Sequence, residues 1–88
     1  MDENLRLRAD RVDWRLVEGE VVALDVATSD YLAVSGAGSV IWEALAAGAR
    51  RDELVDRVVA RYDVDRATAA TDVDAFVARL DARGLVER

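Results

Sequence analysis

The chain has 88 residues and a formal net charge of −6, from 12 basic and 18 acidic side chains. This length suits a single domain with one modest core, and the negative charge disfavours long-range attraction to phosphate backbones. Histidine and cysteine are absent. The chain therefore lacks the commonest general base, the commonest metal ligand and the best thiol nucleophile, so we expect neither an enzyme nor a bound metal or cofactor.

Targeting and membrane signals are also missing from the sequence. No apolar run approaches the roughly 20 residues of a membrane-spanning helix, and the first residues lack a signal peptide's basic start. We expect a cytoplasmic protein with no membrane or nucleic-acid partner. Residues 1–10 are expected to be a flexible segment or the start of the first strand, and residues 11–88 to form a single domain.

Three runs of alternating side chains predict an antiparallel meander over residues 11–16, 20–26 and 30–34. Glu18 and Gly19 supply the first turn, and residues 27–29 supply the second. In the third strand, Leu32 and Val34 fall on one face, and Tyr31 and Ala33 on the other.

Three helices are expected after the meander, over residues 36–47, 52–62 and 66–83. Ser35 and Asp65 are plausible N-caps for the first and third helices. Gly48 and Gly84 suit the residue after a helix end, and Leu85 can pack back on the last turn. The fold class is therefore α+β and winged-helix-like, with a three-stranded antiparallel sheet followed by three helices.

The third strand is interpreted as an open sheet edge. It contains no proline and only one charge, Asp30, so its unpaired backbone groups could pair with a second chain. The last helix is expected to lie alongside it and to form a groove. The candidate peptide-binding residues are Asp30, Tyr31, Leu32, Ala33, Val34, Val73, Asp74, Phe76, Val77, Leu80 and Asp81.

Each group of candidates has a second interpretation. Phe76 and Leu80 fit the core better than a contact surface, and Val73 and Val77 fit either role. Asp74 and Asp81 would meet basic side chains of a guest peptide, or they form an ordinary solvated helix face.

Several segments in order carry a resemblance to a known family. They are EVVALD (20–25), DYLAVS (30–35), VIWEAL (40–45) with Gly48, DELV (52–55), YDV (62–64), and the last helix followed by GLV (84–86). This order resembles PqqD-type proteins, although LAVS (32–35) departs from the family's small-Leu-Asn pattern before the first helix. The resemblance implies a RiPP recognition element, which captures the leader segment of a ribosomally made precursor peptide as a fourth strand.

The same resemblance implies partners. The short chain looks most like the freestanding recognition proteins of lasso peptide clusters, which work with a separate leader peptidase and a cyclase. The alternative is the pyrroloquinoline quinone pathway, with a radical SAM enzyme as partner. A monomer or a weak dimer is expected.

Two other classes of function remain as alternatives, a DNA-binding protein and a dimerisation module, and an enzyme is disfavoured. A winged-helix DNA-binding protein needs clustered basic residues, but the last helix carries as many aspartates as arginines. An acidic dimerisation module would use the same open edge for self-pairing. An enzyme would need a carboxylate pair such as Asp63 and Asp65, which serve more often as helix caps.

Overall fold

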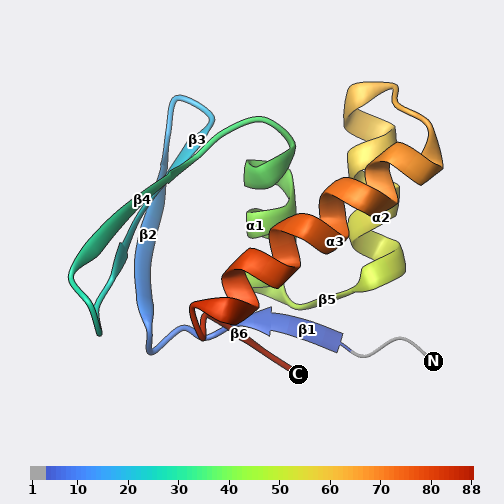
Figure 1. Ribbon diagram of the computed structural model, residues 1–88. Coiled ribbons are helices and arrows are strands. Elements are labelled where there is room, and N and C mark those ends of the chain that lie inside the picture. The colour runs from blue at the N-terminus through green and yellow to red at the C-terminus, as the bar shows by residue number, and fades with distance from the viewer. Residues whose placement is uncertain (1–3) are drawn as a thin grey trace.

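A three-stranded meander at one end of the molecule and three helices at the other make up the fold in the computed structural model, which describes residues 4–88 (Figure 1). In chain order the elements are β1 Asn4–Leu7, β2 Val12–Val17, β3 Glu20–Asp25, β4 Asp30–Val34, α1 Ala37–Ala47, β5 Ala49–Arg50, α2 Arg51–Tyr62, α3 Arg66–Ala82 and β6 Val86–Glu87. The predicted α+β architecture, with the sheet before the helices, is confirmed.

The meander has the strand order β2-β3-β4, so β2 and β4 are both edge strands. Glu18 and Gly19 have φ values of 53° and 83° between the paired residues Val17 and Glu20. Two positive-φ residues in a two-residue loop form the type I′ turn that matches the twist of a hairpin. This turn fixes the β2–β3 register. In the β3–β4 pair, Leu32 lies opposite Ala23 on the face that points toward the helices.

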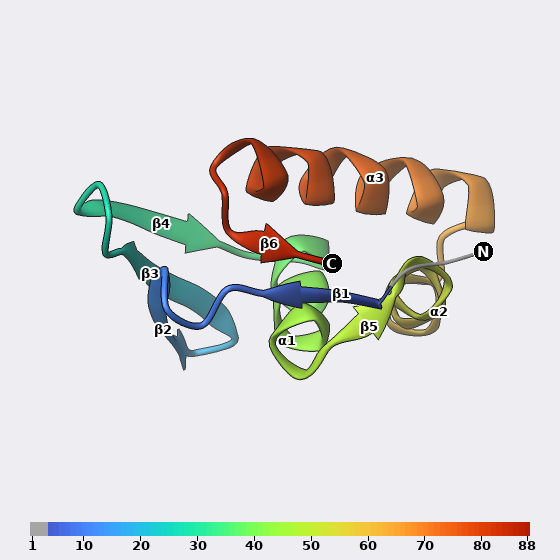
Figure 2. The ribbon, with the colours of Figure 1, turned by 90° about the horizontal axis from the view of Figure 1, so that it is seen from below.

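A second small sheet, which the sequence analysis did not predict, has the order β5-β1-β6. β1 pairs with β5 through Leu5 and Ala49 and with β6 through Leu7 and Val86. Leu5 and Leu7 are buried in the core. Residues 4–7 thus form a strand of their own, separate from the meander, and residues 1–3 lie outside the described part of the chain. Figure 2 shows β1 beneath α3, with β6 beside it.

The helix ends follow the sequence at three of the four predicted caps, including Gly48, which ends α1 with a φ of 90°. Asp65 Oδ1 accepts a hydrogen bond from the Thr68 N–H at 2.7 Å, as expected of an N-cap. At the other end of α3, Gly84 has a φ of 75°, and the Leu85 N–H donates to the Leu80 carbonyl at 3.0 Å. This is a Schellman ending. The Ser35 prediction is wrong: α1 begins after Gly36, with no side-chain cap.

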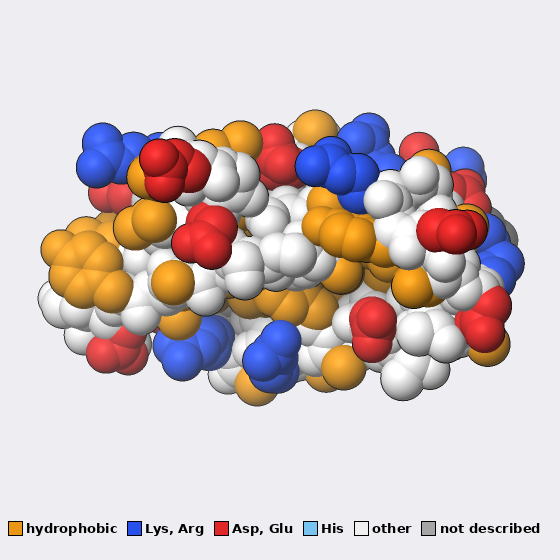
Figure 3. Space-filling model, turned by 90° about the horizontal axis from the view of Figure 1, so that it is seen from above, with side chains coloured by type: hydrophobic (Ala, Val, Ile, Leu, Met, Phe, Trp, Pro, Cys, Tyr) orange, Lys and Arg blue, Asp and Glu red, His pale blue; other side chains and the backbone are white. Residues whose placement is uncertain are grey.

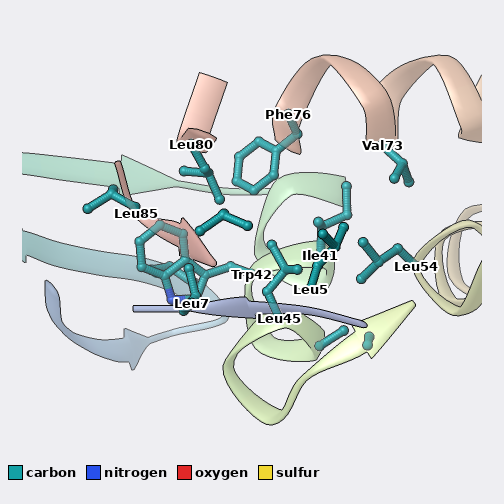
Figure 4. Close-up of a cluster of buried hydrophobic side chains, with 14 of the residues drawn as sticks. Leu5, Leu7, Ile41, Trp42, Leu45, Leu54, Val73, Phe76, Leu80 and Leu85 are labelled. Carbon is teal, nitrogen blue, oxygen red and sulfur yellow. The ribbon is translucent and has the colours of Figure 1, made fainter. Parts of the chain in front are cut away.

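The core lies where α1 is surrounded by the other elements. Trp42 of α1 is fully buried, and its ring meets Trp14 of β2 edge-on, with ring centroids 6.1 Å apart. Figure 4 shows Phe76 and Leu80 pointing from α3 toward α1, whereas Val73 points toward Leu54 of α2. Helix α3 therefore packs on α1 through Phe76 and Leu80 and on α2 through Val73.

Candidate functional site

The free edge of β4 presents backbone groups at alternate residues. The two-residue β2–β3 turn and the Val26 N–H to Arg11 carbonyl hydrogen bond of 3.0 Å fix which β3 residues bond to β2. In an antiparallel ladder the remaining β3 residues bond to β4. These are Val21, Ala23 and Asp25, and their partners are Val34, Leu32 and Asp30. The N–H and C=O groups of Tyr31 and Ala33 therefore point outward, away from the sheet.

A groove of about 510 Å³ lies between this edge and α3. We call it the β4–α3 groove. Its lining comes from β4, from the start of α1 and from one flank of α3, and consists of Leu32, Ala33, Val34, Ser35, Ala37, Gly38, Asp72, Phe76, Arg79, Leu80 and Arg83. The outward backbone groups of β4 thus lie at one wall of a concave surface.

The floor of the groove is apolar and closely packed. Phe76 and Leu80 are 7% and 4% exposed, and Leu32 and Val34 are half-buried. A Cβ at Gly38 would lie 2.6 Å from Val34 Cγ1 and 3.1 Å from Phe76 Cε1. Only glycine lets the first turn of α1 approach both side chains, which gives Gly38 a packing role that outweighs its cost to the helix.

Charged side chains surround this apolar floor. The Arg79 guanidinium lies 5.6 Å from the centroid of the Phe76 ring, within reach of a cation–π interaction. Arg83 Nη1 lies 3.9 Å from Asp30 Oδ2, so this exposed ion pair links the end of α3 to the start of β4. Asp72 lines the groove nearer the start of α3.

Four of the predicted site residues lie on the other flank of α3. Val73, Asp74, Val77 and Asp81 line a separate hollow of about 290 Å³ beside Leu5 of β1. Val73 is fully buried, so it offers no contact surface. Val73 and Val77, which were expected to form one wall with Phe76 and Leu80, therefore lie outside the β4–α3 groove.

The two aspartates of this hollow already have partners. Asp74 accepts two hydrogen bonds from Arg51, at 2.7 and 2.9 Å, and these bonds lower the pKa of its carboxyl group. Asp81 accepts a hydrogen bond from Arg88 at 3.3 Å. Neither carboxylate lines the β4–α3 groove, so their proposed role in meeting a basic guest loses its geometric support.

Tyr31 also lies away from the groove. It pairs with Leu24 on the outer face of the meander, and 78% of its surface is exposed. Its contribution to the edge is therefore through its backbone. Asp30 lies at the rim, where its carboxylate meets Arg83.

Three charged residues of the groove were not among the predicted site residues: Asp72, Arg79 and Arg83. With 3.6 residues per turn, positions 72, 76, 79, 80 and 83 form one flank of the helix, and positions 73, 74, 77 and 81 form the other. Both flanks contain apolar residues because α3 packs on two sides. The helical spacing of Asp72, Phe76, Arg79 and Arg83 places them on one flank of α3. Nothing in the sequence of α3 indicates that this flank is the one that faces β4.

A match to a protein-family model decides which family the chain belongs to. The model of the family described as coenzyme PQQ synthesis protein D (PqqD) matches residues 20–86, which include the meander from β3 onward and all three helices. The chain belongs to the PqqD family. A search of curated proteins finds no match for it.

Two solved structures share the PqqD-like fold over nearly the whole chain. "TbiB1 in Complex with the TbiA(beta) Leader Peptide" is 35% identical, with a TM-score of 0.84, and the match covers 93% of this chain and 94% of that one. "Lasso peptide synthetase B1 complexed with the leader peptide" is 23% identical, with a TM-score of 0.80, and covers 96% and 98%. The second match supports the fold alone. This PqqD-family chain is thus similar to proteins solved with a leader peptide.

Other kinds of site find no support in the described part of this PqqD-family protein. Residues 4–88 contain no group of three or more His, Cys, Asp or Glu side chains placed to hold a metal ion. No described helix is long and apolar enough to cross a bilayer. Basic side chains on the face in Figure 3 are dispersed among carboxylates, unlike the continuous basic surface of a DNA-binding face.

Proposed function

We propose that this protein binds the leader segment of a ribosomally synthesised precursor peptide by strand addition to β4. The observation that carries the proposal is the outward backbone ladder of Tyr31 and Ala33 beside an apolar groove. In strand addition, main-chain hydrogen bonds supply affinity and alternate side chains enter pockets and supply selectivity. A guest strand on β4 would direct every second side chain toward Phe76 and Leu80.

The similarity to TbiB1 supports the choice of guest. That protein was solved with the TbiA(beta) leader peptide, and it is 35% identical to this chain over almost its full length. We propose that the protein acts in the cytoplasm as a non-catalytic carrier. It would deliver the leader to a separate leader peptidase and a cyclase of a lasso peptide pathway.

A second candidate is a peptide chaperone of the pyrroloquinoline quinone pathway, with a radical SAM enzyme as partner. The description of the matching family favours it. The two candidates differ in the enzyme that receives the peptide, and both use the same groove. Co-purification of the protein and its bound peptide with a transglutaminase-like peptidase, or with a radical SAM enzyme, would separate them.

Amide exchange and NMR titration with a leader peptide test the proposal. The TbiA(beta) leader serves as the first probe, and the leader of a precursor encoded beside this protein serves as the second. We expect new protection of the Tyr31 and Ala33 amides, which face outward in the free protein, and shifts at Phe76 and Leu80. Shifts confined to the hollow around Val77, or no binding of either leader, would contradict strand addition at β4.

A further inference from the structure

Charge is distributed unevenly along the β4–α3 groove. Arg79 and Arg83 line it toward the end of α3, and Asp72 lines it about two turns earlier. Arg83 is already close to Asp30, at 3.9 Å. Arg79 differs, because no carboxylate of residues 4–88 lies within ion-pair distance of its guanidinium, whose recorded contact is with the Phe76 ring.

We propose that Arg79 is a carboxylate subsite, which selects an aspartate or glutamate at one position of the guest strand. This inference rests on the proposed function and specifies which peptides fit the groove. The guanidinium is always charged and presents a planar fork of donors that suits a carboxylate. Its contact with the Phe76 ring, at 5.6 Å from the centroid, restricts its rotamers at the groove rim, so less conformational entropy is lost when a guest binds.

The position of the acidic guest residue follows from the spacing of residues along helix α3 and along an extended guest strand. Asp72 and Arg79 are seven residues apart on α3, which is about 10 Å along the helix, whereas a strand rises about 3.3 Å per residue. Guest side chains that face α3 recur at every second residue. An acidic side chain one or two such positions away from Arg79 would lie near Asp72, so the subsite accepts acid in only one register.

The overall charge of the protein does not decide this local preference. A net charge of −6 repels an acidic peptide at long range, but salt near 0.1 M screens charges separated by more than about 10 Å. Contact with Arg79 occurs well inside that distance. Since the arginine is exposed at the rim, replacing the guest's glutamate by glutamine should weaken binding by about fivefold.

A peptide display library tests the proposal without knowledge of the natural leader. Randomised twelve-residue peptides are selected on the wild-type protein and on the Arg79→Glu and Arg79→Gln variants. We expect the wild-type pool to be enriched in Asp or Glu at one position relative to the apolar anchors. Arg79→Gln, which retains a polar stem over Phe76, should abolish that enrichment, and Arg79→Glu should change it to Lys or Arg.

The matched control is Arg57→Glu, which makes the same charge change on an exposed residue of α2 outside the groove. Its selected pool should keep the acidic position. A wild-type pool without an acidic position, or an acidic position that persists in both Arg79 variants, would overturn the inference. A wild-type pool with no strand-like peptides bound at β4 would instead contradict the proposed function.

Discussion

The guanidinium of Arg11 lies 3.7 Å from the buried carboxylate of Asp25. The same side chain donates to the carbonyl oxygens of Arg83 at 3.1 Å and Gly84 at 3.5 Å, at the end of α3. Arg11 therefore joins the meander to the helix close to the Asp30–Arg83 ion pair at one end of the groove. It links the end of β3, where Asp25 pairs with Asp30 of β4, to the end of α3.

Arg11→Gln should reduce both stability and peptide affinity. The change leaves the Asp25 carboxylate without its positive partner and releases two carbonyls at the end of α3, so we expect a loss of about 1–3 kcal/mol in unfolding free energy. Urea unfolding followed by tryptophan fluorescence measures it. Arg8→Gln is the matched control, because its pair with Glu87 is long, at 3.9 Å, and exposed. If Arg11→Gln lost only as much unfolding free energy as the Arg8→Gln control, about 0–1 kcal/mol, the result would contradict a stabilising role for Arg11.

The stability supplied by Asp25 should disappear in acid. Burial by itself raises the pKa of this carboxyl group, but the Ala27 N–H, at 3.1 Å, and the Arg11 charge together lower the pKa below its usual value. A pKa lowered by folding means that the contribution is complete above the unfolded value of about 3.9 and is lost progressively as pH falls from there through the lower pKa of the folded state.

Asp25→Asn, compared with wild type at pH 7 and at about pH 3, checks the direction of this effect. The variant should be less stable at pH 7. The difference in unfolding free energy between variant and wild type should narrow at the lower pH, because the unfolded carboxyl group of wild type then takes up a proton and this offsets part of the stability that ionised Asp25 supplies. An equal difference in unfolding free energy between wild type and variant at both pH values would show that the charge of Asp25 does not stabilise the fold.

Local patterns predicted the parts of the fold that depend on near neighbours in the chain. Alternation placed Leu32 and Val34 on one face of β4, and the Asp65 cap and the Gly84–Leu85 ending follow from side-chain and backbone chemistry within one helical turn. The second sheet was missed because its strands are short and pair across the length of the chain, as Leu7 does with Val86. Nothing local to either residue signals such a pairing.

The position of the groove, between β4 and α3, was predicted, but the residues of α3 that line it were not. Strand β4 and helix α3 were expected to face each other, and they do. Which flank of α3 faces the strand depends on how α1 and β1 pack beneath the helix, and the sequence of α3 carries apolar residues on both flanks. Val77 therefore resembled a groove residue as closely as Phe76 did, and Arg79 resembled a solvated arginine.

Gly38→Ala should disturb the groove more than an ordinary helix substitution does. A Cβ at this position would lie 2.6 Å from Val34 Cγ1, so the Val34 side chain must move, and the Phe76 ring, at 3.1 Å, must shift by a few tenths of an ångström. Alanine in a helix normally stabilises by up to about 1 kcal/mol relative to glycine, and we expect destabilisation by about 1–3 kcal/mol here. Thermal unfolding and leader titration measure the two effects. A variant as stable as wild type with unchanged affinity would contradict this packing role.

Asp65→Ala should destabilise the protein without changing the groove. The carboxylate caps α3 through the Thr68 N–H, and this hydrogen bond lowers its pKa. Removal of such a cap costs about 1 kcal/mol. Leader affinity at a temperature where the variant is folded should match wild type, since Asp65 lies at the far end of α3 from Arg83. Weakened binding by the folded variant would show that the start of α3 influences the groove.

Ala33→Pro tests the open edge directly. The Ala33 N–H points away from β3, so proline removes no hydrogen bond of the folded sheet but removes one donor available to a guest strand. We expect leader affinity to fall by about tenfold or more, with a much smaller effect on the melting temperature. Leu16→Pro is the matched control, because the Leu16 N–H points outward from β2, the opposite edge of the same sheet. Equal affinity of Ala33→Pro and wild type would exclude β4 as the pairing edge, and a loss confined to Leu16→Pro would place the guest on β2.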